Sequence, residues 1–260
     1  MSEMKKEVID VFQRVEDKYP MTKAQARELL EAMKDHITED AYFRYTVRSV
    51  YFDNDDSQLV IRSLMKPKYK MKLRLRCYGE PEGNTPVFLE TKKKYGDIVY
   101  KKRIQLSEEE AEDYIGCGIM HHVQNNTASE IDYLMNYYNL SPKVYIAYDR
   151  QCYSSRSERD VRITFDYNVR YRLDNVDLHE YGSEEQLTDD DTVIMEVKAM
   201  DRYPMWLVRL LSERKMYRQS FSKYARIYSL NQNEMNPQHS DAYAYNAISQ
   251  KEKMLCSVQY

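Results

Sequence analysis

The sequence predicts an α+β fold with an antiparallel β-sheet, and two observations support this prediction. Several segments alternate charged and apolar residues, and a side-chain period of two is typical of β-strands. Most of these segments follow one another with helical segments inserted between hairpins, an order that favours antiparallel pairing. The clearest case is KYKMKLRLRCYG, residues 68–79, in which Lys or Arg occupies every second position from Lys68 to Arg76.

The N-terminal half is predicted to contain a helix followed by four strands. Thr22 is a suitable N-cap for the segment TKAQARELLEAMKDHI, in which apolar residues recur three and four positions apart. The predicted strands of this half are residues 45–53, 68–79, 86–94 and 97–106, and the last two form a hairpin around Gly96.

The C-terminal half is predicted to add three helices and three strands. Ser107 and Glu110 form a capping box that begins one helix, a second covers residues 129–138, and Pro204 lies in the first turn of the third. The predicted strands are residues 143–150, 160–172 and 192–200. After residue 230 the sequence is polar and aperiodic. We therefore expect one domain over residues 1–230 and a polar C-terminal tail over 231–260, either mobile or docked on a partner.

Four of these strands separate charge from apolar surface, and their charged faces carry many cations and few carboxylates. They lie within residues 68–79, 88–94, 161–166 and 193–198. Two other strands are mixed, because cations share a face with Val99 in one strand, and with Val144 and Ile146 in the other. Two arrangements remain open. The faces can be solvated, or the strands can close into a barrel with the charged faces inward and helices packed outside. Because unpaired buried charge is costly, such a tunnel needs an anion or water inside it.

Composition restricts the classes of function. The chain has 260 residues, 42% of them hydrophobic, and a net charge of −3. This near-neutral total gives no indication of nucleic-acid binding or membrane binding. A membrane partner is compatible with the sequence but is not indicated by it. There is no Walker loop, no GxGxxG and no CxxC pair among the four cysteines. The N-terminal segment lacks the apolar core of a signal peptide, so a soluble, cytoplasmic protein is expected.

Eight motifs in order resemble a known family. RVEDKY resembles the first-strand signature of triphosphate tunnel metalloenzymes. Together with it, the sequence is similar to the vacuolar transporter chaperone (VTC) domain, the polyphosphate polymerase branch of that superfamily, through SVYFDN, KLRLRCYG, FLETKKK, YDRQCY, VRITFD, MEVK and SFSKYARIY. The resemblance covers residues 11–230. It implies a closed antiparallel β-barrel tunnel that is lined by Lys and Arg and binds triphosphate or polyphosphate with a divalent metal.

The resemblance also implies roles for individual residues. Tyr148 would donate a hydroxyl group, Glu196 would hold the metal, Mn²⁺ or Mg²⁺, and Lys198 is included because it shares a face with Glu196. Phosphate oxygens would be bound by Lys18, Arg74, Arg76, Lys92, Lys101, Arg150, Arg162 and Lys223. One departure is that polymerases of this branch can carry a lysine three positions before Lys223, where this chain has Ser220. That difference bears on the handling of the chain rather than on the phosphate site.

The residue types suit phosphoryl transfer, but each has a simpler interpretation. Phosphoryl transfer depends mainly on positioning and on neutralising charge, and hard cations prefer oxygen ligands. On the other hand, Glu196 and Lys198 can form an ordinary ion pair, and Glu16 and Glu90 can simply orient a Lys or Arg. The segment at Lys223 can be the start of a short helix, although such a start is a natural anion site.

Three functions follow, and the sequence alone does not separate them. The first is an enzyme, a metal-dependent polyphosphate polymerase that transfers the terminal phosphoryl group of ATP to a polyphosphate chain. The second is a triphosphate hydrolase with the same tunnel, in which a glutamate positions water. The third is a non-catalytic sensor of polyphosphate or inositol phosphates.

Overall fold

The structure is a computed structural model that describes residues 8–12, 15–96, 98–117, 125–158, 160–179 and 181–235. Its strands are β1 Val8–Phe12, β2 Val15–Thr22, β3 Ile37–Asp53, β4 Tyr69–Tyr78, β5 Val87–Tyr95, β6 Ile98–Leu106, β7 Ser141–Ser155, β8 Arg162–Arg172, β9 Glu185–Gln186 and β10 Thr192–Ala199. Its helices are α1 Lys23–Met33, α2 Gln58–Leu64, α3 Glu108–Cys117, α4 Asn126–Tyr138, α5 Met205–Glu213, α6 Lys223–Leu230 and α7 Gln232–Met235. None of these described helices is long and apolar enough to span a bilayer.

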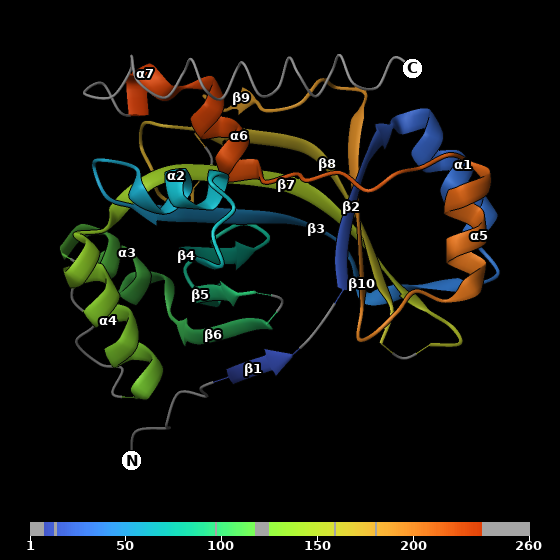
Figure 1. The fold of residues 1–260 in the computed structure, drawn as a ribbon. Coiled ribbons are helices and arrows are strands. Elements are labelled where there is room, and N and C mark those ends of the chain that lie inside the picture. Colours follow the sequence, from blue (N-terminus) through green and yellow to red (C-terminus); the bar gives the residue numbers. More distant parts are fainter. Residues whose placement is uncertain are drawn as a thin grey trace.

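The strands form one antiparallel sheet in the order β1-β6-β5-β4-β3-β7-β8-β10-β2, with the short β9 paired to β8 (Figure 1). The predicted antiparallel α+β fold is therefore confirmed. The predicted closed barrel is wrong, because β1 and β2 lie at opposite edges of this order and no ladder joins them in the described part of the chain.

The chain itself explains why the sheet curls without closing. Phe12 ends β1 and Val15 begins β2, so three Cα steps of about 3.8 Å hold the two edges within roughly 11 Å of each other. The first of these strands pairs with β6 and the second with β10. Within the described residues the N-terminal segment is thus divided between the two edges, and neither β1 nor β2 pairs with a second strand.

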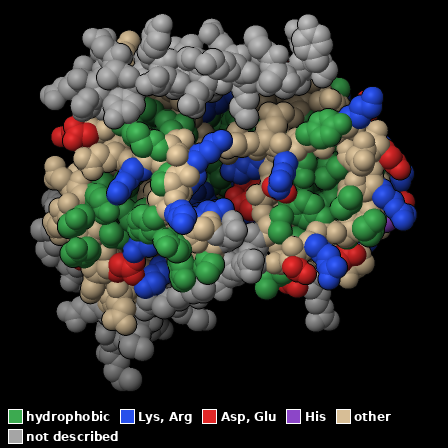
Figure 2. Space-filling view, viewed as in Figure 1, with side chains coloured by type: hydrophobic (Ala, Val, Ile, Leu, Met, Phe, Trp, Pro, Cys, Tyr) green, Lys and Arg blue, Asp and Glu red, His purple; other side chains and the backbone are tan. Residues whose placement is uncertain are grey.

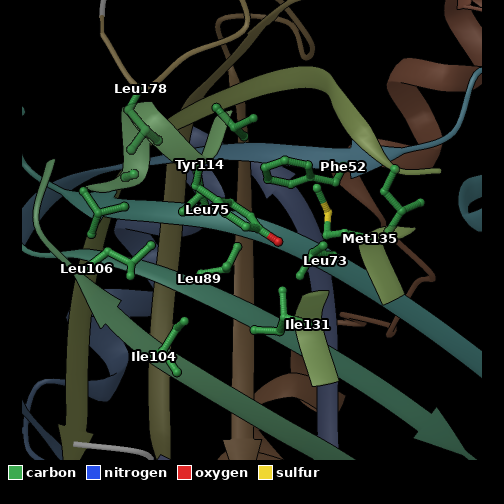
Figure 3. Close-up of a cluster of buried hydrophobic side chains, with 14 of the residues drawn as sticks. Phe52, Leu73, Leu75, Leu89, Ile104, Leu106, Tyr114, Ile131, Met135 and Leu178 are labelled. Atoms are coloured by element: carbon green, nitrogen blue, oxygen red, sulfur yellow. The ribbon is translucent and has the colours of Figure 1, made fainter. Parts of the chain in front are cut away.

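Helices cover the outer face of the sheet in two places. The apolar residues of β4, β5 and β6 pack with α3 and α4, as Figure 3 shows for Leu73, Leu75, Leu89 and Ile104. The apolar residues of β2, β8 and β10 pack with α1 and α5 at the other side of the molecule (Figure 1). In β4, β5, β8 and β10 these residues have the parity that the sequence assigned to the apolar face of the strand.

The inner face is mixed, as the two mixed strands require. Along β7 it changes from Val144 and Ile146 to Tyr148 and Arg150, and α6 packs against the apolar part through Tyr224 and its neighbours. One half of the interior is therefore filled by hydrophobic side chains and α6, and the charged side chains are confined to the rest.

Most element boundaries agree with the predictions, but β3 begins at Ile37 rather than at residue 45, and β1 and α2 were not predicted. For α2 the cause is non-local. The sequence gives no local start signal for α2, since Ser57 makes no side-chain capping bond. The helix is capped instead from the end of β3, where the Asp53 carboxylate accepts hydrogen bonds from the backbone N–H groups of Leu59 and Val60, both at 2.9 Å. The predicted N-cap at Thr22 and the predicted capping box of Ser107 with Glu110 are both confirmed.

The predicted tail is described only in its first residues. α7 follows α6 directly and is held to α2 because the Ser57 hydroxyl donates to the backbone oxygen of Met235 at 3.3 Å. Residues 236–260 of the predicted tail, like the turn residue Asp97, lie outside the described residues.

Leu89→Ala is expected to lower the free energy of unfolding by about 2–5 kcal/mol. Leu89 is fully buried between β5 and the helices α3 and α4, so truncation leaves a cavity that the sheet cannot fill. Urea denaturation followed by circular dichroism measures the change. Leu64→Ala, at a position 42% exposed, is the control and should change stability by less than about 0.5 kcal/mol.

Candidate functional site

The charged side chains of the inner face form one connected cluster, which we call the cationic site. Figure 2 shows Lys and Arg side chains gathered around a hollow in the middle of this face of the molecule. Its cations are Lys18, Lys72, Arg74, Arg76, Lys92, Lys101, Arg150, Lys198 and Lys223. Its carboxylates are Glu16, Glu90, Asp166 and Glu196. The nine cations exceed the four carboxylates, so the cluster retains capacity for an anionic ligand.

Glu90 on β5 is the centre of the first group. Its Oε2 atom accepts from Nε and Nη2 of Arg74 at 2.9 and 2.8 Å, and its Oε1 atom lies 3.0 Å from Nζ of Lys101. Arg76 lies further away, at 3.9 Å. Burial alone would raise the pKa of Glu90, but these cations reverse that effect and hold it well below its usual range. Glu90 is therefore ionised and fixes the guanidinium group of Arg74 on the inner face.

Asp166 on β8 organises the second group. Arg150 donates to both of its oxygens, at 2.7 and 2.9 Å, and Lys223 at the start of α6 donates to Oδ2 at 2.5 Å. The same two cations lie over the ring of Tyr148, at 5.0 and 4.0 Å from its centroid. The short helix α6 thus contributes its first residue to the site. Tyr148 meets these cations with its ring face, whereas the resemblance implied a hydroxyl donor.

Glu196 on β10 lies between two lysines. Its Oε1 atom is 2.5 Å from Nζ of Lys198, and its Oε2 atom is 3.7 Å from Nζ of Lys18. Burial would raise the pKa of Glu196, but Lys198, Lys18 and Arg150 hold it well below its usual range. Lys18 also donates to the backbone oxygen of Phe221 at 2.9 Å, which anchors the segment before α6 to β2.

Glu16 and Lys92 connect the two sides of the curled sheet. Glu16 Oε2 lies 3.1 Å from Lys92 Nζ, although β2 and β5 are far apart in the strand order. This contact shows that the charged faces of distant strands point toward one another. Burial and the negative charge of Glu196 both raise the pKa of Glu16. The positive charges of Lys92 and two other lysines outweigh these effects, so the pKa of Glu16 is lowered overall.

Five residues that contribute to the site were not among the predicted site residues, namely the carboxylates Glu16, Glu90 and Asp166 together with Lys72 and Tyr51. Lys72 belongs to the alternating row of β4 and donates to the Ser222 hydroxyl at 3.0 Å; burial, with Lys18 and Lys92 nearby, lowers its pKa to about 8. Tyr51 accepts from Nη1 of Arg74 at 3.0 Å, and although burial opposes ionisation, Arg74 and Lys72 lower its pKa to about 7. The parity of Lys72 was a usable signal in the sequence, whereas Tyr51 has no charge that would mark it.

Arg162 does not belong to the cluster, although it was predicted with the others. It has the same parity on β8 as Asp166, but it lies at the first position of the strand, its side chain is 49% exposed, and it pairs with Asp40 at 2.7 Å. The remaining predicted phosphate contacts, Lys18, Arg74, Arg76, Lys92, Lys101, Arg150 and Lys223, lie together in the cationic site, as does Lys198.

A second group of potential metal ligands lies outside the cationic site. Glu108 and Glu112 on α3 and His179 in the segment after β8 bring their ligand atoms within 4.8 Å of one another. The group does not include Glu196, and its residues lie on the helical side of the sheet rather than on the inner face.

Comparisons with known proteins show which family the chain resembles. Residues 13–230 match the VTC domain family. Vacuolar transporter chaperone complex subunit 4 of Trypanosoma brucei brucei is 24% identical over 69% of this chain and 27% of its own length, so the chain spans about a quarter of that relative.

One solved structure shares the fold at low sequence identity, and a second shows a weaker similarity. A putative adenylate cyclase from Bacillus halodurans matches with a TM-score of 0.52 and 14% identity over 82% of this chain and 95% of its own. A putative adenylyl cyclase from Hippeastrum matches with a TM-score of 0.47 and 12% identity over 83% and 95%. The family match extends from the segment between β1 and β2 to the end of α6, and so includes every residue of the cationic site; the chain belongs to the VTC domain family.

Proposed function

We propose that this protein is a metal-dependent polyphosphate polymerase, which transfers the terminal phosphoryl group of ATP to a polyphosphate chain bound in the cationic site. The observation that carries the proposal is the excess of cations over carboxylates on one enclosed face, since phosphates are the anions that such a face neutralises best. Membership of the VTC domain family supports it.

Arginines and lysines are expected to have different roles in the cationic site. Arg74, Arg76 and Arg150 present planar guanidinium groups that can hold two phosphate oxygens at once, and Glu90 and Asp166 fix two of these groups in place. Lysines supply point charges that neutralise the transferred group without fixing its orientation. Positioning of this kind is most of what phosphoryl transfer requires from a protein.

The donor set also fits a divalent metal. Glu196 and Glu16 are ionised carboxylates on neighbouring strands, and the charge of each opposes the other. A hard cation such as Mn²⁺ or Mg²⁺ would relieve that repulsion and prefers such oxygen ligands together with substrate phosphates. We assign the metal to Glu196, with Glu16 as its neighbour. When bound, the ion would neutralise charge that develops on the transferred phosphoryl group.

Product analysis tests the proposal against its two alternatives. The protein is incubated with ATP and Mn²⁺, and the products are resolved by gel electrophoresis and by release of inorganic phosphate. Long polymer supports the polymerase. Free phosphate without polymer would replace it with the triphosphate hydrolase, and tight binding without turnover would replace it with the polyanion sensor.

Tripolyphosphate affinity is expected to fall about tenfold as the pH rises through about 7 and about 8, the pKa values of Tyr51 and Lys72. Above these values Tyr51 gains a negative charge and Lys72 loses its positive charge, and both changes disfavour an anion. Calorimetric titration at several pH values measures the effect. The protonation of tripolyphosphate itself changes identically in experiments with the wild type and with Tyr51→Phe. A weaker pH dependence of affinity in Tyr51→Phe therefore measures the contribution of Tyr51, and an unchanged pH dependence would contradict that contribution.

A further inference from the structure

The cationic row of β4 and β5 continues beyond the cationic site. Lys72 and Lys92 lie directly opposite each other, and the next pair of the same parity, Lys70 and Lys94, is also directly opposite. Lys68 and Lys66 follow in the segment between α2 and β4. Exposure increases in this direction, from the buried Arg76 to the exposed Lys68 and Lys94. The row therefore runs from the interior to the surface.

What distinguishes these outer lysines is that they lie together in one row, since Lys23 and Lys215 also have no ion pair among the described residues. Within the part of the chain that the structure describes, Lys66, Lys68, Lys70 and Lys94 form no ion pair. On the opposite face of the same hairpin, by contrast, Lys93 and Lys102 both bind Glu130. Burial lowers the pKa of Lys70, and the positive charges of Lys94 and Lys66 lower it further. Like charges directly opposite on neighbouring strands destabilise a sheet, so this arrangement costs stability unless an anion lies on it.

We propose that Lys70 and Lys94, with Lys68 and Lys66 beyond them, form a track for the part of a polyphosphate chain that extends out of the cationic site. This inference rests on the proposed function and specifies its substrate as a long chain. Alternate residues are about 6.6 Å apart, so the track adds roughly 13 Å from Lys72 to Lys68. A triphosphate held in the interior does not need that length, whereas a growing polymer does.

The track also assigns a direction to the chain. At the opposite end of the inner face Arg162 is already paired with Asp40, and Lys198 with Glu196. Among the described residues Arg103, toward that end, also has no ion pair, but it lies over the ring of Phe88. The lysines that have neither kind of partner continue the row at the end of Lys70 and Lys94. A linear polyanion with evenly spaced charges matches the regular spacing of the lysines along the strand.

The test compares long-chain polyphosphate with tripolyphosphate on the same variants. Lys70→Gln/Lys94→Gln removes two positive charges from the track, and Lys23→Gln/Lys215→Gln removes two from exposed positions on α1 and after α5. At low salt the track variant is expected to bind long-chain polyphosphate at least about fivefold more weakly, since a surface lysine near a polyanion contributes about that factor. Its affinity for tripolyphosphate should change less than about twofold, and the loss should shrink at high salt. The control variant should match the wild type with both ligands.

Other outcomes overturn the inference in distinguishable ways. Equal losses for both ligands would assign the two lysines to the cationic site itself, and no loss for either ligand would leave the row merely solvated. If the track variant loses as much affinity for a single-stranded oligonucleotide as for long-chain polyphosphate, the row is a general polyanion-binding surface. If the wild type fails to bind tripolyphosphate, the proposed function fails first, and the track fails with it.

Discussion

Arg74→Ala is expected to weaken tripolyphosphate binding by about 1.5–3 kcal/mol, which corresponds to roughly 10-fold to 150-fold in the dissociation constant. Arg74 lies at the centre of the cationic site, where Glu90 and Tyr51 hold its guanidinium group. Truncation removes a charge-assisted donor that can bind two oxygens, and it leaves the phosphate without that partner in a largely enclosed site. Calorimetric titration at two salt concentrations measures the loss.

Arg162→Ala is the matched control, because it removes the same group from the same predicted set. Arg162 is half exposed and pairs with Asp40 at the end of β8. Its truncation should therefore weaken the free energy of tripolyphosphate binding by less than about 1 kcal/mol. Arg74→Lys should give an intermediate loss, since it keeps the charge but not the planar fork. Equal affinities for Arg74→Ala and the wild type would show that the inner face of β4 is not the binding surface.

The face of each strand could be predicted from the sequence, because parity is a local property. In β4 a period of two places Arg74 and Arg76 together and Leu73 and Leu75 opposite them, and the structure has them so. The same reasoning placed Lys92 on the charged face of its strand, whereas parity left the strands of Lys101 and Arg150 mixed and these two residues came from the resemblance. Parity does not give depth, however: Arg162 shares a face with Asp166 but lies at the end of its strand, where the side chain reaches solvent.

What faces each strand across the interior could not be predicted, because it depends on non-local pairing. Glu16 and Lys92 are 76 positions apart and lie on strands that are not neighbours in the sheet. Their contact follows from the curl of the whole sheet. The open edges had the same cause, since nothing in residues 8–22 indicates that one part pairs with β6 and the next with β10. The resemblance implied a closed tunnel, and the two separate edges of the sheet correct that expectation.

The expected effect of Glu196→Gln is a loss of metal-stimulated phosphoryl transfer of at least about 100-fold, with the fold intact. The substitution keeps the shape of the side chain but removes the negative charge that a divalent cation requires. Lys18 and Lys198 lose an ionic partner, yet their side chains are 26% and 32% exposed, so water can solvate them and unfolding is not expected. Activity is measured with ATP over a range of Mn²⁺ concentrations, and stability by urea denaturation.

Metal-free binding of tripolyphosphate separates the metal ligand from an ordinary ion pair. In both interpretations Glu196→Gln removes a negative charge from the cationic site, so affinity without metal should stay equal or rise. If Glu196 is a metal ligand, the activity of Glu196→Gln no longer responds to Mn²⁺. Full activity with unchanged Mn²⁺ dependence would show that Glu196 is only the ion-pair partner of Lys198. Glu90→Gln is the control: Glu90 holds Arg74 and Lys101 in a buried network, so its loss should cost about 3–5 kcal/mol of stability while the remaining activity keeps its metal dependence.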